Sequence, residues 1–160
     1  MYLSPTCEEE IYKIIAKQKS NKAAGYDDIS INVIKFVGNS LCKPLCELFN
    51  NSLKCGIFPD SLKMAKVTPI FKTGNKDSVC NYRPVSVLST FSKLLERIFY
   101  NRLFNYVKKK NILNVSQYGF LEKRSTSLAL IDLVHEISSS LDDNKLTAGV
   151  FIDLKRPLTP

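Results

Sequence analysis

The sequence predicts a helix-rich α/β (α+β) fold that carries one basic β-hairpin. Apolar residues recur every three or four positions along most of the chain, which is the spacing of amphipathic helices. Two short β-rich runs, Val67–Phe71 and Pro84–Leu88, flank a polar segment, which is typical of a hairpin. The chain has 160 residues, 44% of them apolar, and can therefore bury one core.

The first predicted helix begins near Thr6. Thr6 and Glu9 have the spacing of a capping box, and the acidic residues after Thr6 face the positive end of the helix dipole. Its predicted buried stripe consists of Ile11, Ile14 and Ile15. Residues 19–28, which include Gly25, are expected to form a loop.

Two further helices are predicted before the hairpin. Ser30 can cap a short helix that Gly38 stops. Apolar residues at helical spacing from Leu41 to Leu53 predict a longer helix, which Gly56 ends.

Two helices and a strand are predicted after the hairpin. The first helix starts at Ser89 or Thr90 and ends at three lysines, whose charges suit the negative end of the helix dipole. A loop from Asn114 to Arg124 precedes an amphipathic helix capped by Ser125. A turn then leads into an apolar strand, Thr147–Leu154.

The charge of the chain favours a polyanionic partner. Its formal net charge is +8 and its isoelectric point is near 9.3. An ordinary basic surface is the alternative. Five cations cluster about the hairpin and predict salt-dependent contacts with RNA phosphates: Lys63, Lys66, Lys72, Lys76 and Arg83. Among them, Lys66 and Lys76 are assigned to the RNA template.

Cysteine and histidine usage predicts an intracellular protein without disulfides. The five cysteines form no Cys-x-x-Cys pair, and His135 is the only histidine, so neither a disulfide framework nor a zinc site is indicated. No apolar run has the roughly 20 residues of a membrane span, and the start lacks the pattern of a secretion signal. We therefore expect a soluble protein of the nucleus or cytoplasm that is not secreted.

Two cations flank the predicted hairpin tip. Lys72 precedes the tip and Arg83 follows it, so a hairpin brings them together. Arginine offers a planar fork to phosphate oxygens and lysine a point charge, a combination that suits a nucleotide triphosphate. Two solvated surface cations are the alternative. The tip between them is expected to be long and mobile.

Asp153 is the candidate metal ligand. It interrupts an apolar run, and a buried carboxylate is costly unless it binds a metal or ends a strand. Both explanations stay open. Tyr26-Asp27-Asp28 has flanks that do not favour strands, so it is interpreted as a loop in which one aspartate supports a turn.

Seven segments in order resemble the reverse transcriptase of a non-LTR (LINE-type, jockey-like) retrotransposon. These segments are Asn21–Asp27, Leu48–Leu53, Gly56–Pro59, Val67–Lys72, Asn81-Tyr82-Arg83-Pro84-Val85-Ser86, Gln117-Tyr118-Gly119-Phe120 and Val150-Phe151-Ile152-Asp153-Leu154. Their order and spacing carry the resemblance, which covers nearly the whole chain. It implies the fingers and the start of the palm of a right-hand polymerase that copies an RNA template from a DNA primer, with dNTPs and Mg²⁺.

The resemblance also implies roles for single residues. Lys72 and Arg83 match the fingers cations that hold the triphosphate of the incoming nucleotide. Asp153 matches the first catalytic, metal-binding aspartate of the palm. The residues that match the loop against the template are Gln117, Gly119 and Phe120.

The implied domain organisation is a partial reverse transcriptase domain over residues 1–160. Residues 1–146 correspond to the fingers, 147–154 to the first palm strand and 155–160 to a divergent tail. In that tail Leu158 takes the place of an aromatic residue that screens the 2′-OH, and Pro157 interrupts the segment. Leu121 stands where the family often has arginine.

The sequence supplies one catalytic carboxylate, whereas two-metal nucleotidyl transfer needs at least two carboxylate positions. We therefore expect a polymerase fragment that is inactive by itself. The alternatives are a non-enzymatic nucleic-acid-binding module that retains the basic fingers, and a truncated product without a stable fold.

Overall fold

A computed structural model describes residues 3–153. They fall into two compact units, one within Met1–Lys110 and one within Asn111–Pro160. The elements of the first unit are α1 (Glu8–Lys17), α2 (Ile31–Phe36), α3 (Gly38–Cys55), α4 (Asp60–Lys63), β1 (Ala65–Phe71), the 3₁₀ turn η1 (Val79–Asn81), β2 (Tyr82–Leu88) and α5 (Thr90–Lys109). The second unit contains α6 (Thr126–Asp142). The expected helix-rich fold with one antiparallel hairpin is confirmed.

The core of the first unit lies between α1, α2, α3 and α5. Phe49 of α3 and Ile98 of α5 are fully buried. The other buried apolar residues are Ile11, Ile14, Ile15, Ile31, Ile34, Cys42, Leu45, Leu62, Leu94 and Leu95. Full burial of one such side chain contributes about 1.5–3 kcal/mol, so this cluster supports a stable fold for the unit.

The start of α1 differs from the expected capping box. Cys7 is the N-cap residue and makes no side-chain cap hydrogen bond. Thr6 lies one residue earlier, and its hydroxyl donates to Glu10 at 2.8 Å. Its backbone is held instead by Asn50 of α3, which accepts from the Thr6 N–H at 2.7 Å. Long-range packing on α3 therefore sets where α1 begins.

Serine caps fix the starts of three helices, as predicted. The hydroxyls of Ser30, Ser89 and Ser125 accept from backbone N–H groups at the starts of α2, α5 and α6. Gly56 ends α3 in the left-handed conformation, with φ of 69°. Gly38, expected to stop α2, is instead the first residue of α3, and α2 ends at Phe36.

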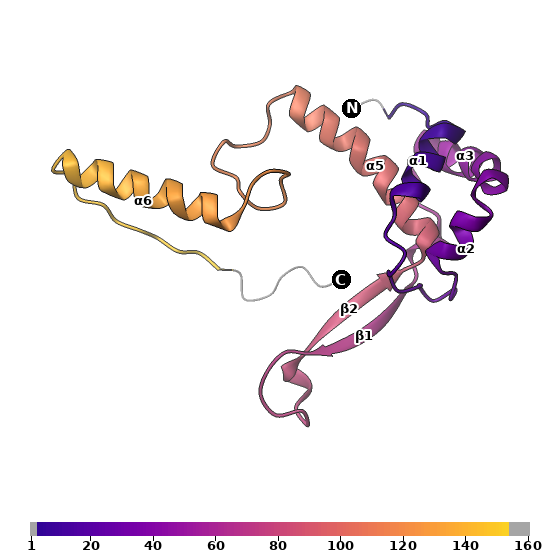
Figure 1. The fold of residues 1–160 in the computed structure, drawn as a ribbon, viewed down its shortest axis with the longest axis horizontal. Coiled ribbons are helices and arrows are strands. Elements are labelled where there is room, and N and C mark those ends of the chain that lie inside the picture. Colours follow the sequence, from indigo (N-terminus) through magenta and orange to yellow (C-terminus); the bar gives the residue numbers. More distant parts are fainter. Residues whose placement is uncertain (1–2, 154–160) are drawn as a thin grey trace. The chain divides into compact units, whose positions relative to one another are not determined.

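The hairpin of β1 and β2 extends away from the helices of its unit (Figure 1). The antiparallel register runs from Ala65 opposite Leu88 to Phe71 opposite Tyr82. Most hairpin side chains are exposed on both faces. Because a two-stranded sheet without a packed face is marginally stable, contacts at its base must hold it in place.

The second unit consists of a loop, α6 and an extended segment. No residue of α6 is buried within the described chain. The predicted helix is confirmed, but its apolar stripe is exposed, including Leu128, Ile131, Val134 and Leu141. Among the described residues no helix has both the length and the hydropathy that a membrane crossing requires.

The strand predicted at Thr147–Leu154 is not found. Thr147–Asp153 has no strand assignment, and Leu154 lies outside the described residues. A strand needs a hydrogen-bonded neighbour, and no segment within residues 3–153 pairs with this one. The apolar pattern alone therefore does not suffice to make a strand here.

Candidate nucleic-acid interface

The register of the hairpin places its predicted cations by face. Directly opposite residues of an antiparallel pair share a face, and alternate residues along a strand return to it. Arg83 lies opposite Ile70, and Lys66 lies opposite Val87. The ladder continues one step beyond the strand, because the N–H of Lys72 donates to the carbonyl of Asn81 at 2.8 Å.

Lys66, Lys72 and Arg83 therefore belong to the same face of the hairpin, and Lys72 and Arg83 are diagonal neighbours. Both are exposed. Within residues 3–153 no carboxylate forms an ion pair with either. Lys66, nearer the base, lies 3.8 Å from a carboxylate oxygen of Asp28 in an exposed ion pair.

The opposite face is aromatic. The rings of Phe71 and Tyr82 meet edge to face, with centroids 5.5 Å apart. The ammonium of Lys76 lies 5.8 Å from the centroid of Phe71, and the hydroxyl of Tyr82 donates to the carbonyl of Lys76 at 3.0 Å. The structure thus separates Lys76 from the face that carries Lys72 and Arg83.

Hydrogen bonds link residues within the hairpin tip. The amide of Asn81 donates to the carbonyl of Asn75 at 2.7 Å, and the side chain of Asn75 accepts from the N–H of Asp77 at 3.0 Å. Gly74 has φ of 98°, and a Cβ there would lie 2.8 Å from the Asn81 amide. These contacts join residues of the tip between Lys72 and Arg83.

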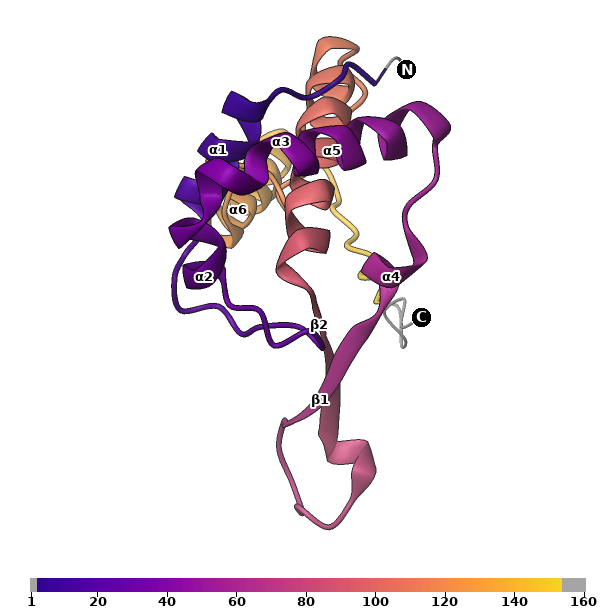
Figure 2. The same ribbon diagram turned by 90° about the vertical axis from the view of Figure 1, so that its right-hand side faces the viewer.

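The loop before α2 braces the base of the hairpin. A Cβ on Gly25 would lie 2.6 Å from the backbone of Ser89, so only glycine allows this approach. The hydroxyl of Tyr26 donates to the carbonyl of Ser61 at 2.8 Å, and that of Thr90 donates to the carbonyl of Ile29 at 3.1 Å. Figure 2 shows this indigo loop reaching the junction of β2 and α5.

The bracing role of this loop was missed by the sequence analysis, which assigned it no function. The signal was Gly25 in the segment Asn21–Asp27. The interpretation of Tyr26-Asp27-Asp28 as a loop is confirmed, and Asp27 supports a turn by accepting from the N–H of Ile29 at 3.3 Å.

The predicted template residues of the second unit lie in one loop. Gln117 donates to the carbonyl of Gly119 at 3.4 Å, and Phe120 is fully exposed with φ of 64°. Between them, Tyr118 donates to Asp132 of α6, which raises the pKa of the tyrosine. The guanidinium of Arg124 lies 5.1 Å from the Tyr118 ring centroid. The loop therefore presents one aromatic ring to solvent and holds another against α6.

Asp153 is exposed, so the argument from a buried carboxylate does not apply to it. No group of three or more histidine, cysteine, aspartate or glutamate side chains suited to a metal ion occurs within residues 3–153. The described residues thus do not fit a complete magnesium site.

The tail predictions, at Pro157 and Leu158, fall outside the described residues. All five cysteines are unpaired thiols.

Comparison with known proteins shows that the chain is similar to RNA-directed DNA polymerases of transposons. The chain is 32% identical over 155 residues to a probable RNA-directed DNA polymerase from transposon BS of Drosophila melanogaster. It is 30% identical over 155 residues to the RNA-directed DNA polymerase from mobile element jockey of the same organism. Each match covers 96% of the chain. No family model matches.

A third relative is a putative 115 kDa protein of the type-1 retrotransposable element R1DM of Drosophila melanogaster, 28% identical over 91% of the chain. The chain spans 17%, 17% and 14% of the length of these three proteins. The resemblance is thereby confirmed: the chain is related to one segment of the reverse transcriptases of jockey-like, non-LTR retrotransposons.

Proposed function

We propose that this chain supplies the fingers and the start of the palm of a retrotransposon reverse transcriptase, holding the incoming dNTP and the RNA template. Copying RNA into DNA from a primer, with Mg²⁺, belongs in this proposal to the complete polymerase. The observation that carries it is the position of Lys72 and Arg83, diagonal neighbours on an exposed hairpin face without carboxylate partners in the described chain.

Each cation has a distinct part in this proposal. Arg83 lies within the β2 ladder, so its backbone is fixed while its planar fork can give two parallel hydrogen bonds to phosphate oxygens. Lys72 lies at the start of the closed tip and adds a point charge. Together they offset the negative charge of a triphosphate.

The template is assigned to the remaining predicted residues. Phe120 offers an exposed ring for stacking on an unpaired base, and Gln117 and Gly119 shape the same loop. Lys66 and Lys76 contact template phosphates. Lys76 belongs to the aromatic face, whereas Lys66 lies on the face of Lys72 and Arg83, nearer the base of the hairpin.

The second candidate function is a nucleic-acid-binding module without catalytic activity. It is favoured by Asp153, which in the described chain stands without the further ligands that a metal site needs. In both functions the cationic hairpin binds phosphates. They differ in whether Lys72 and Arg83 select a free triphosphate or the phosphates of a strand.

Titration of the 160-residue chain with dTTP tests the proposal. We expect Arg83→Ala and Lys72→Ala each to weaken dTTP binding about tenfold, since a charge-assisted hydrogen bond contributes roughly 1.5–3 kcal/mol. Lys76→Ala is the matched control, because it removes the same charge from the other face and should leave dTTP binding unchanged. Equal losses in all three variants would assign dTTP binding to net charge and overturn the proposed nucleotide site.

A further inference from the structure

A cationic hollow lies on the helical part of the first unit, formed by the start of α5 and the segment after α1. Its volume is about 370 Å³. Its lining residues are Gln18, Lys22, Lys93, Glu96, Arg97 and Tyr100. Three cations against one carboxylate give it a net positive charge. None of these residues belongs to the hairpin or to the proposed template loop.

A hydrogen bond between α5 and the loop before α2 lies beside this hollow. The ammonium of Lys93 donates to the carbonyl of Ala23 at 3.2 Å, which ties the loop before α2 to α5. This contact keeps Lys22, one residue earlier, at the rim of the hollow. Lys22 and Lys93 therefore both contribute ammonium groups to the lining of the hollow.

A stacked column of side chains lies along α5 beside these lysines. The guanidinium carbon of Arg97 lies 5.4 Å from the centroid of the Tyr100 ring. Tyr100 in turn stacks on Phe104, with centroids 5.5 Å apart and ring planes at 11°. Tyr100 is 41% exposed. An arginine beside a ring presents a planar guanidinium on which a nucleic-acid base can stack.

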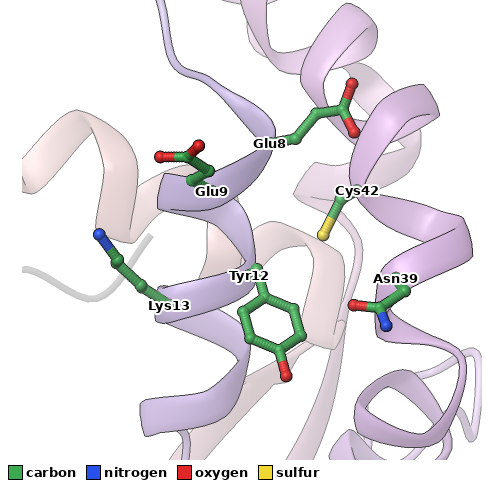
Figure 3. Close-up of a pocket in the computed structure, with 6 residues that line it drawn as sticks. All are labelled: Glu8, Glu9, Tyr12, Lys13, Asn39 and Cys42. Carbon is green, nitrogen blue, oxygen red and sulfur yellow. The ribbon is translucent and has the colours of Figure 1, made fainter.

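A second hollow of this unit has the opposite character (Figure 3). It lies between α1 and α3, has a volume of about 320 Å³, and contains two carboxylates and one lysine. Those charged residues are Glu8, Glu9 and Lys13. Of these two hollows, the α5 hollow is the one that suits an anion. The hollow between α1 and α3 offers Lys13 as a control cation.

We propose that the α5 hollow binds one nucleotide of a single-stranded nucleic acid. Lys22 and Lys93 contact the phosphate, and the base stacks on the column of Arg97 and Tyr100. Ammonium groups beside a stacking platform are the combination by which proteins bind single strands without reading their sequence. The site is independent of the proposed triphosphate site, so either assignment can fail without the other.

The test is binding of the full chain to a fluorescent single strand of about ten nucleotides, a length within the site sizes of single-strand-binding proteins. Tyr100→Ala and Arg97→Lys should each weaken binding about five- to tenfold, the second despite its unchanged charge. Tyr100→Phe should bind as wild type. Lys22→Ala should also reduce the slope of log affinity against log salt by about 0.7, the value for one phosphate contact on a single strand. The control Lys13→Ala should change affinity less than about twofold.

An abasic strand of the same length keeps the phosphates but lacks the bases. Its binding to the wild-type protein therefore separates the contribution of base stacking from that of charge. We expect the wild type to bind the ordinary strand more tightly than the abasic one, and Tyr100→Ala to lose most of that difference. Circular dichroism melting identifies any variant that fails to fold. Wild-type affinity in Arg97→Lys, or an undiminished preference for bases in Tyr100→Ala, would overturn the site. Equal losses in Lys22→Ala and Lys13→Ala would show a non-specific charge effect and would likewise overturn it.

Discussion

Arg102 of α5 holds both carboxylate oxygens of Glu10 of α1, at 2.7 Å for each nitrogen–oxygen pair. The same guanidinium donates from Nε to the carbonyl of Ser4 at 2.8 Å and from Nη2 to that of Pro5 at 3.1 Å. One side chain thus fastens the N-terminal segment and α1 to the helix that follows the hairpin. The ion pair is largely shielded, with side-chain exposures of 11% for Arg102 and 28% for Glu10.

Loss of this contact should destabilise the first unit. We expect Arg102→Ala to lower the free energy of unfolding by about 2–3 kcal/mol, because it removes several charge-assisted hydrogen bonds and leaves the Glu10 carboxylate without them. Arg102→Lys should recover only part, since an ammonium cannot reproduce the fork. Urea denaturation measures the effect. Lys63→Ala is the control, because it breaks only an exposed ion pair with Asp60. If Lys63→Ala lowered the free energy of unfolding as much as Arg102→Ala does, this account would be contradicted.

Acid should remove the same stabilisation. The hydrogen bonds from Arg102, and to a lesser extent that from Thr6, hold the pKa of Glu10 below its ordinary value of 4.5, although burial opposes them. The contribution is therefore fully present above the unfolded-state pKa and is lost as pH falls through the lower folded-state pKa. In urea denaturation from neutral pH to about pH 3, Glu10→Gln should show a smaller loss of stability than the wild type. Parallel pH profiles for the two proteins would show that Glu10 does not carry this dependence.

Gly25 should be irreplaceable at the base of the hairpin. Gly25→Ala would place a methyl group 2.6 Å from backbone atoms of Ser89, which cannot move aside as a side chain can. We expect a loss of about 1–3 kcal/mol, as for other overpacked sites. Gly119→Ala is the matched control, because nothing lies within 4 Å of a Cβ at that position. Thermal denaturation compares the two, and equal midpoints would refute the close approach of the loop to Ser89.

The 160-residue chain alone should not extend a primer on an RNA template. Asp153 is exposed, and the described residues offer no group of side chains that could complete a site for two hard cations. The assay is incorporation of labelled dNTP with Mg²⁺ present. Template-dependent extension that Asp153→Ala abolishes would show that the residues of this chain suffice for catalysis.

Local signals made most helices of this fold predictable. Ser30, Ser89 and Ser125 cap helices where the sequence indicated, because an N-cap hydrogen bond forms within one turn. The hairpin was also predictable from its two β-rich runs. For Thr6 the same reasoning gave the wrong cap, since contacts with Asn50, 44 residues away, decide its position.

Features that depend on distant partners could not be predicted in this way. The apolar pattern of Thr147–Leu154 suggested a strand, but pairing requires a neighbour that residues 3–153 do not supply. The hydrogen bond from the Asn81 amide to the carbonyl of Asn75 in the hairpin tip is likewise a contact that the sequence pattern did not indicate. For the candidate site, the sequence indicated that Lys72 and Arg83 converge, whereas the separation of Lys76 onto the other face needed the register.

The central claim is that Lys72 and Arg83 hold the triphosphate of the incoming nucleotide. Its most direct test grafts residues 66–88 into the active polymerase of a jockey-like relative and measures the dependence of DNA synthesis on dNTP concentration. We expect Arg83→Ala to raise the KM for dNTP about tenfold or more and Arg83→Lys to recover part, because an ammonium cannot reproduce the fork. RNA affinity should stay unchanged, because the lost fork contacts the triphosphate and not the template. An unchanged KM together with weakened RNA binding would assign both cations to the template strand and contradict the account.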